Sequence, residues 1–141
     1  MIVYLDTSSI VKLYIHAAHT ALVKKWVKEA EIVATCRIAY PETISAITRR
    51  FRQGDLTKEQ YDSLIAKFSN EWGRFAAVDF DELEAGHLVY LYGLRGFDAV
   101  HLSAATLLRT NPNNVELYFS SFDEKLNNAA ATEGFTILSP E

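Results

Sequence analysis

Short apolar runs alternate along this sequence with longer segments of helical periodicity, and this alternation restricts the possible folds more than any other feature. The runs predict buried strands at residues 2–5, 32–35, 76–80, 117–120 and 135–138. Because a segment of helical spacing follows most of these strands, the order favours parallel pairing through helical crossovers. We therefore expect an α/β fold, a three-layer α/β/α arrangement around a central, mainly parallel sheet of four to five strands.

The expected helix boundaries follow from capping residues. Thr7 or Ser8 is expected to cap the helix after the first strand, and Pro41 to begin a helix that runs to Gln53. A capping box is predicted at residues 57–60, and an acidic helix start at residues 81–84. Further helices are expected at residues 20–30 and 99–109 and from residue 123 to about 134, and a turn or loop at 111–114.

Length and composition limit the class of protein. With 141 residues the chain is expected to form a single domain, over residues 1–141. The lone cysteine, Cys36, excludes an internal disulfide and fits a reducing cytoplasm, and no apolar run approaches the roughly 20 residues of a membrane span. The net charge of −4 argues against coating a nucleic acid by overall attraction, but an acidic site with basic residues nearby can still bind a phosphodiester locally.

Four acidic residues stand where a strand is predicted to end or a helix to begin: Asp6, Glu42, Asp98 and Asp123. In a parallel α/β sheet the carboxyl ends of the strands and the starts of the following helices share one edge, so acids distant in sequence can meet there. Carboxylate oxygens gathered in this way are ligands for Mg²⁺ or Mn²⁺.

Each of these acids also has a simpler explanation. Aspartate is a preferred helix cap, and Asp98 and Asp123 taken singly are better explained by capping than by metal binding. Other acids, such as Asp55 and Asp81, also lie near turns, so position alone does not separate ligands from caps. Convergence would separate them, because unpaired carboxylates within a few ångströms raise one another's pKa unless a cation lies between them.

Four segments resemble, in order, the acidic motifs of PIN-domain ribonucleases, with the closest match to VapC-type toxins. They are residues 5–12 (LDTSSIVK), 41–46 (PETISA), 96–105 (GFDAVHLSAA) and 121–126 (SFDEKL). The third segment is the most specific, and together the four extend over essentially the whole chain.

The resemblance implies a Mg²⁺- or Mn²⁺-dependent endoribonuclease of the cytoplasm, usually a homodimer, silenced by a cognate VapB-like antitoxin. Carried over by position, Asp6, Glu42 and Asp98 would be the core metal ligands, and Asp123 a fourth acid that binds metal directly or through water. The hydroxyl of Thr7 or Ser8 would orient a ligand or a water.

Basic and aromatic residues suggest further contacts. Lys12 can lean back toward the acids and meet a phosphate, and Arg49 and Arg50 suit a contact with RNA or an antitoxin remote from the chemistry, although all three also fit an ordinary solvated helix surface. The aromatic stripes are expected to pack in the core or to leave an apolar groove for an antitoxin helix or a second subunit; they comprise Trp26, Tyr61, Phe68 and Trp72.

Histidines give weaker signals. His101, three residues after Asp98, is expected to pack and hydrogen-bond beside the site rather than act as a general base. His16 and His19 have a spacing seen in metal pairs, but they straddle a predicted break between helices and lack further ligands, so a zinc site is not expected.

Three functions stay open from the sequence. The first is metal-dependent hydrolysis of RNA. The second is a non-catalytic PIN-like module that binds RNA or a protein, with the acids serving as caps. The third is a phosphotransfer domain of similar topology, although an aspartyl phosphatase needs a second Asp two residues after the first, where this chain has Ser8.

Overall fold

The computed structural model describes residues 1–109 and 116–140, and the predicted turn at 111–114 lies outside them. The strands are β1 (Ile2–Leu5), β2 (Ile32–Cys36), β3 (Ala76–Val78), β4 (Leu117–Ser120) and β5 (Thr136–Leu138). The helices are α1 (Thr7–Tyr14), α2 (Thr20–Glu29), α3 (Ala39–Arg52), α4 (Lys58–Glu71), α5 (Glu82–Tyr92), α6 (Gly96–Arg109) and α7 (Glu124–Thr132), with a short 3-10 helix η1 (Trp72–Arg74).

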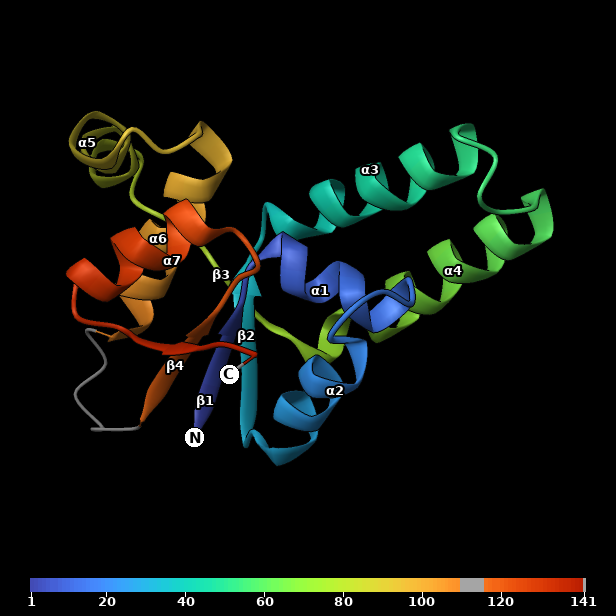
Figure 1. The fold of residues 1–141 in the computed structure, drawn as a ribbon, viewed down its shortest axis with the longest axis horizontal. Helices are drawn as coiled ribbons and strands as arrows, with labels where there is room; N and C mark the ends of the chain where they lie inside the picture. Colours follow the sequence, from blue (N-terminus) through green and yellow to red (C-terminus); the bar gives the residue numbers. More distant parts are fainter. Residues whose placement is uncertain (110–115, 141) are drawn as a thin grey trace.

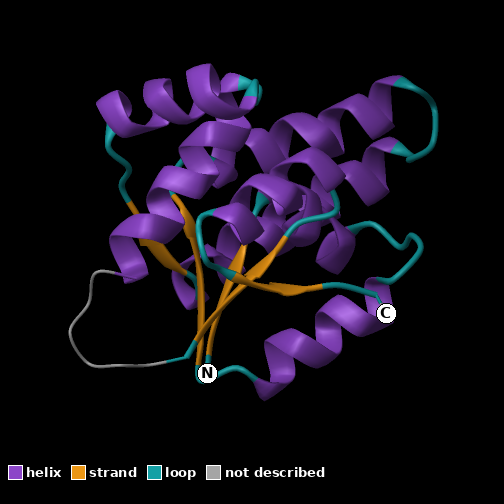
Figure 2. Cartoon of the chain, turned by 60° about the vertical axis from the view of Figure 1, so that its left-hand side comes forward, coloured by secondary structure: helices purple, strands orange, loops and turns teal. Residues whose placement is uncertain are grey.

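The five strands form one sheet in the order β3-β2-β1-β4-β5, and the described strand pairs are all parallel (Figures 1 and 2). β1 lies in the centre, where Val3 pairs with Val33 of β2 on one side and with Tyr118 of β4 on the other. Parallel pairing places the carboxyl ends of neighbouring strands at one edge. The expected α/β fold with a central parallel sheet is confirmed.

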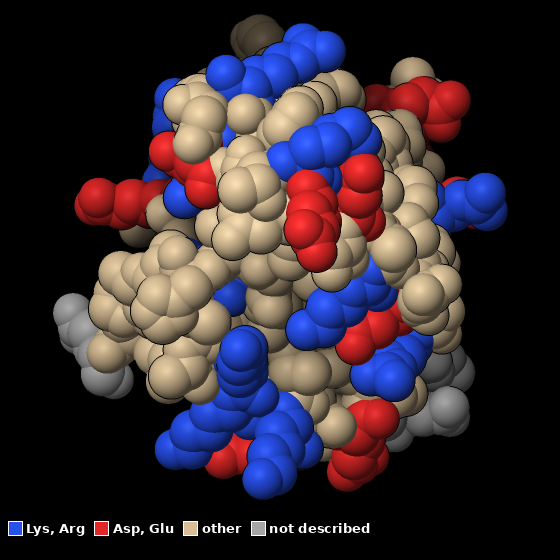
Figure 3. All heavy atoms as spheres, turned by 90° about the vertical axis from the view of Figure 1, so that its right-hand side faces the viewer, with Lys and Arg blue, Asp and Glu red and all other residues tan. Residues whose placement is uncertain are grey.

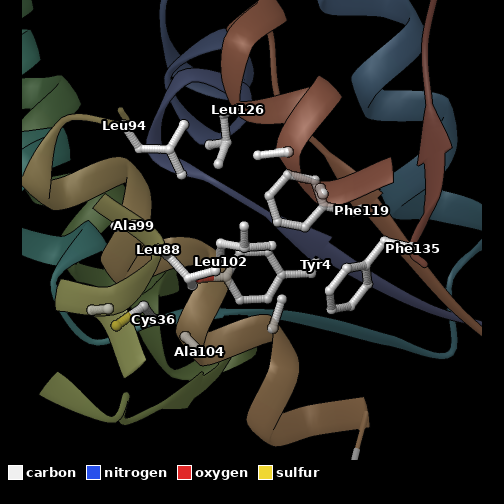
Figure 4. Close-up of a cluster of buried hydrophobic side chains, with 14 of the residues drawn as sticks. Tyr4, Cys36, Leu88, Leu94, Ala99, Leu102, Ala104, Phe119, Leu126 and Phe135 are labelled. Atoms are coloured by element: carbon white, nitrogen blue, oxygen red, sulfur yellow. The ribbon is translucent and has the colours of Figure 1, made fainter. Parts of the chain in front are cut away.

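Helices cover both faces of the sheet because the side chains of β1 alternate between two cores. Tyr4 faces α5, α6 and α7, where it packs with Leu102, Phe119 and Leu126 (Figure 4). The side chains of its neighbours on the strand, Val3 and Leu5, point to the opposite face of the sheet. There they pack in a second core with residues of α1 to α4. In Figure 1, α5, α6 and α7 lie to the left of the sheet and α1 to α4 lie to its right.

Several helix boundaries differ from the sequence predictions. Asp6 itself, and not Thr7 or Ser8, caps α1 by accepting the Ser9 N–H. α3 begins two residues before Pro41, because proline is tolerated anywhere in a first turn, where its missing N–H has no partner in the helix. α6 begins at Gly96, three residues before the predicted start.

Other boundaries agree with the predictions. β4 spans the predicted residues, and the capping box at Thr57 and Gln60 is formed by both of its hydrogen bonds. β3, in contrast, is two residues shorter than predicted and ends at Val78.

No helix within residues 1–109 and 116–140 is long and apolar enough to cross a membrane.

Apolar exposure is concentrated on a helix that the aromatic pattern did not single out. Phe68 and Trp26 of the predicted stripes are buried in the core. The largest exposed apolar side chains within the described residues instead include three from α5: Leu83, Tyr90 and Leu91, which are 83%, 88% and 54% exposed. An exposed apolar surface of this kind is typical of protein interfaces.

Candidate active site

A cleft of about 700 Å³ opens at the edge of the sheet where β1 and β4 end. Its walls come from α1, the α1–α2 loop, α3, the start of α6 and the segment between β4 and α7. Every site residue predicted from the sequence lines this cleft: Asp6, Thr7, Ser8, Lys12, Glu42, Arg49, Arg50, Asp98 and Asp123. The sheet order brings Asp6 and Asp123 together, because they follow the neighbouring strands β1 and β4, and the first turns of α3 and α6 add Glu42 and Asp98.

Asp6 is the most firmly held of the four acids. It is only 3% exposed, and its Oδ1 accepts hydrogen bonds from the Ser9 N–H (3.0 Å) and the Ser8 hydroxyl (2.7 Å). Its Oδ2 accepts from the hydroxyl of Ser121, at 2.6 Å. A carboxylate offers about four acceptor positions, so three bonds leave one position for a further ligand. Ser121 was missed from the sequence, although it stands only two residues before Asp123.

A chain of hydrogen bonds that begins at the buried Tyr4 positions Glu42. Its Oε1 lies 2.5 Å from the Thr7 hydroxyl, which donates to it, and 3.0 Å from His101 Nε2. His101 Nδ1 lies 2.7 Å from the Tyr4 hydroxyl, whose pKa is raised well above its ordinary value, mainly by burial. With Tyr4 protonated and donating to Nδ1, the Nε2 proton of His101 is shared between Glu42 Oε1, at 3.0 Å, and the Thr7 hydroxyl oxygen, at 2.9 Å.

The same contacts set the charge of Glu42. Burial disfavours its ionised form, but the hydrogen bonds from His101 and Thr7 outweigh burial and hold the pKa of Glu42 below its ordinary value. His101 is buried and bonded through both ring nitrogens, so the prediction that it packs and hydrogen-bonds beside the site is confirmed. The Thr7 hydroxyl contacts one of the four acids, Glu42, and its role in orienting a metal ligand stays a prediction.

Arg95 joins the other two acids. Its Nε donates to Asp98 Oδ2 and its Nη2 to Asp123 Oδ2, both at 3.2 Å, while its side chain stays 81% exposed. Asp98 lies in the first turn of α6 and is not its cap, whereas Asp123 does cap α7 through Oδ1 and the Leu126 N–H. Arg95 was missed from the sequence, although its position three residues before Asp98 is a spacing that permits ion pairs.

Burial, with a smaller effect of the neighbouring acids, raises the pKa of Asp98. Arg95 opposes that rise, and the negative charges of Asp123 and Asp6 add to it. The net pKa of Asp98 lies above the ordinary value, so Arg95 does not fully offset burial and the smaller effect of the neighbouring acids. An additional cation in the cleft would lower the energy of the ionised form.

The predicted basic contacts lie on the walls of the same cleft. Lys12 Nζ donates to the Ala18 carbonyl at 2.8 Å and lies 4.5 Å from the centre of the Phe122 ring. Arg50 Nε forms an ion pair at 2.8 Å with Asp55, which is not one of the four acids of the cleft. Arg49 and Arg50 line the same cleft as the four acids, so the contact predicted for them falls on its wall.

The donors in this cleft fit a hard divalent cation in chemistry. Mg²⁺ and Mn²⁺ prefer carboxylate oxygens and retain several waters, so a few acids suffice. Within residues 1–109 and 116–140, no three His, Cys, Asp or Glu side chains are already arranged closely enough to hold one ion in common. Binding would therefore need Asp98 and Asp123 to reorient from Arg95, which the exposure of that arginine allows.

Comparison with known proteins places the chain in a family. The model of the PIN domain matches residues 3–131. The chain belongs to the PIN domain family. The same four acidic segments that line the cleft fall within this match. Membership of the PIN family argues against the phosphotransfer alternative.

Individual relatives of this PIN domain agree with the family match. Ribonuclease VapC49 of Mycobacterium tuberculosis is 29% identical over 136 residues, which cover 94% of this chain and 92% of the relative. Among solved structures, PAE2754 from Pyrobaculum aerophilum has a TM-score of 0.68 and 18% identity, covering 96% of this chain and 87% of its own. VapC20 of Mycobacterium tuberculosis, described as a sarcin-ricin loop cleaving toxin, has a TM-score of 0.64 and 19% identity, covering 98% and 99%. These structures share the fold.

Proposed function

We propose that this PIN domain is a divalent-metal-dependent endoribonuclease of the cytoplasm, the toxin of a VapBC-type toxin–antitoxin pair. The observation that carries the proposal is the convergence of four acids from four separate segments on one cleft. The similarity to a relative named as a ribonuclease supports RNA as the substrate. The proposal extends the family assignment to a reaction, the hydrolysis of RNA phosphodiester bonds.

In this proposal Asp6, Glu42, Asp98 and Asp123 hold the cation. Mg²⁺ or Mn²⁺ bound there would supply Lewis-acid activation of water and offset negative charge on the phosphoryl group. The hydroxyls of Ser8 and Ser121 donate hydrogen bonds to Asp6, and the hydroxyl of Thr7 donates one to Glu42. In this proposal these hydroxyls hold the acids in place and do not contact the substrate.

Basic residues at the cleft would bind the RNA backbone. Arg95 is exposed and donates hydrogen bonds of 3.2 Å to Asp98 and Asp123. When these two acids bind a cation instead, the guanidinium would be free to bind a phosphate oxygen. Arg49 and Lys12 lie on the walls of the cleft, where they would hold the phosphates on either side of the reacting one. Positioning of this kind makes attack at the phosphorus effectively intramolecular.

Purified protein, free of antitoxin, tests the proposal directly. We expect cleavage of labelled RNA with Mg²⁺ or Mn²⁺, no cleavage with EDTA, and loss of cleavage in Asp98→Asn with an unchanged circular dichroism spectrum. The matched control is Asp62→Asn, an exposed acid on α4 that pairs with Lys58. Failure of the wild-type protein to cut any RNA with either metal, at every protein concentration tested, would end the proposal.

One observation favours a second function, a non-catalytic module that binds RNA or a protein. Arg95 already bonds Asp98 and Asp123, and Asp6 and Asp123 cap helices, so each of these acids has a structural role without metal. Calorimetric titration with Mn²⁺ separates the two functions. A site of millimolar or tighter affinity that is weakened in Asp98→Asn supports the nuclease, and its absence supports the module.

For the partners, we propose a cognate antitoxin related to VapB and a second copy of the chain. The exposed apolar surface of α5 supports a protein interface, since Leu83 and Tyr90 are more than four-fifths exposed. Light scattering on Leu83→Glu combined with Tyr90→Glu tests the second copy. A dimeric wild-type protein and a monomeric variant are expected, and a monomeric wild-type protein at micromolar concentration would remove the homodimer from the proposal.

A further inference from the structure

An aromatic stack begins at the wall of the cleft and leads outward. Phe122 lines the cleft directly before Asp123, and the ring of His19 lies nearly parallel to it, with centroids 5.8 Å apart and planes 12° apart. The indole of Trp26, which is buried, supports Phe122 at 6.5 Å and 23°. Lys12 lies over the Phe122 ring and holds the α1–α2 loop by its bond to Ala18.

His19 is held in an unusual backbone conformation to reach this position. Its φ is 69°, and it is the one non-glycine residue with a positive φ among the described residues. Histidine tolerates this left-handed region better than most residues, but the conformation still costs energy and persists where the surroundings require it. His19 gives no side-chain bond to the helix that it precedes, so capping does not explain it. The exposed imidazole therefore continues the stack from Phe122 into solvent.

Charge favours RNA on this side of the cleft. Eleven of the fourteen Lys and Arg residues belong to residues 1–75, which include α1 to α4, although the whole chain carries a net charge of −4. Lys24, Lys25 and Lys28 are exposed on α2, the helix that begins directly after His19. Figure 3 shows Lys and Arg side chains gathered low on the face that carries α2, below a hollow in the surface. A phosphodiester chain leaving the cleft is attracted along this side.

We propose that His19, stacked on Phe122, is a nucleobase-binding subsite that takes an unpaired base of single-stranded RNA next to the acid cleft. Imidazole and phenyl rings are among the side chains on which unpaired RNA bases stack. The lysines of α2 then hold the phosphates beyond that base. The inference rests on the proposed ribonuclease function and adds to it that the substrate must be unpaired at the nucleotide beside the reacting phosphate.

The test compares two proteins and two RNA strands, with fluorescence anisotropy in EDTA as the readout. His19→Asn removes the ring, while asparagine keeps the left-handed backbone. One strand is a short single-stranded RNA of mixed sequence, and the other has the same length and phosphates but abasic ribose throughout. His16→Asn, which changes an exposed histidine of the same loop, is the matched control. Thermal melting of each variant checks that the fold is retained.

Wild-type protein is expected to bind the intact strand at least about fivefold more tightly than the abasic strand, because one base stacked on an aromatic ring contributes on that scale. His19→Asn is expected to lose most of this preference while binding the abasic strand like the wild type, and His16→Asn to keep it. Equal preference in wild type and His19→Asn, or no binding of either strand by the wild type, would overturn the subsite.

A cleavage assay in Mg²⁺ or Mn²⁺ separates this inference from the proposed function. With the subsite present, His19→Asn raises KM about fivefold or more and leaves kcat close to that of the wild type. Cleavage by the wild type with unchanged KM in His19→Asn would reject the subsite and retain the ribonuclease. Base-dependent RNA binding without any cleavage would reject the ribonuclease and retain RNA binding at His19.

Discussion

Replacing Ser121 by alanine tests whether the hydroxyls around Asp6 hold the cleft together. Ser121 is 2% exposed, and its hydroxyl donates to Asp6 Oδ2 at 2.6 Å while accepting the Asp123 N–H at 3.0 Å. Alanine removes the donor and leaves the Asp6 carboxylate with two of its three bonds. Because the acid is almost completely buried, water has little access to replace the lost donor.

The expected loss follows from the charge of the acceptor. A hydrogen bond to a charged group contributes about 1.5–3 kcal/mol, and the unpaired Asp123 N–H places Ser121→Ala toward the upper end of that range. In a domain of this size about 4 °C of melting temperature corresponds to each kcal/mol, so a loss of about 2–3 kcal/mol should lower the melting temperature by roughly 8–12 °C. Ser63→Ala, an exposed serine within α4, is the matched control and should change the melting temperature by less than about 2 °C.

A double-mutant cycle with Asp6→Asn assigns the loss to the contact. The neutral amide introduced by Asp6→Asn interacts more weakly with a hydroxyl than the carboxylate does, so Ser121→Ala should cost at least about 1 kcal/mol less in that background. Thermal or urea unfolding in EDTA measures all four proteins. If Ser121→Ala costs the same free energy of unfolding in both backgrounds, Ser121 does not act through Asp6 and the reasoning fails.

Two further predictions concern the charges in the cleft. Arg95→Gln removes the cation beside Asp98 and Asp123 and should tighten Mn²⁺ binding in calorimetry at low salt; equal or weaker binding would show that Arg95 does not compete with metal. The pKa of Asp98 is raised in the folded protein, so its favourable contribution to stability is complete below the pKa of the unfolded chain and is lost as pH rises through the folded pKa. In EDTA, Asp98→Asn should therefore gain melting temperature relative to wild type between about pH 3 and pH 7. A constant difference across that range would contradict the raised pKa.

Strands were easier to predict from the sequence than helix starts, for a physical reason. Strand bounds follow burial, and β4 matched because its apolar run ends at the residue where the strand leaves the sheet. β3 stops early because its partner strand β2 ends at Cys36, the residue that pairs with Val78. Helix starts depend on which backbone N–H groups find partners. Pro41 and Asp98 were the residues that predicted the starts of α3 and α6, but in both helices the two residues before them are already helical.

The site was predictable in its acids and not in its supporting contacts. Acids after strands are visible as sequence motifs, and the parallel order of the sheet brings them to one edge. The links from Ser121 to Asp6, from Tyr4 to His101 and from His101 to Glu42 connect residues 115, 97 and 59 positions apart. No local pattern specifies such pairs, because they depend on how the layers pack.

The sequence left open whether Asp123 is a helix cap or a metal ligand. Its two carboxylate oxygens allow both roles. Its Oδ1 caps α7 through the Leu126 N–H, and this bond fixes the side chain so that Oδ2 faces Asp98 across Arg95. Capping thus orients the second oxygen toward the cleft. Asn is as good a cap as Asp, so Asp123→Asn should unfold like the wild type yet bind Mn²⁺ more weakly, whereas Asp123→Ala should in addition lose about 1 kcal/mol.

Chemical unfolding and calorimetry on the two Asp123 variants therefore measure the two roles separately. Ala destabilises through the lost cap, which the charge change in Asn does not affect, and both variants lose the oxygen charge that faces the cleft. If Asp123→Asn bound Mn²⁺ like the wild type, Asp123 would be a cap alone, and the cation would rest on the other three acids. If Asp123→Ala were as stable as Asp123→Asn, the capping bond would not be what orients Oδ2, and the link between helix start and cleft geometry would have to be abandoned.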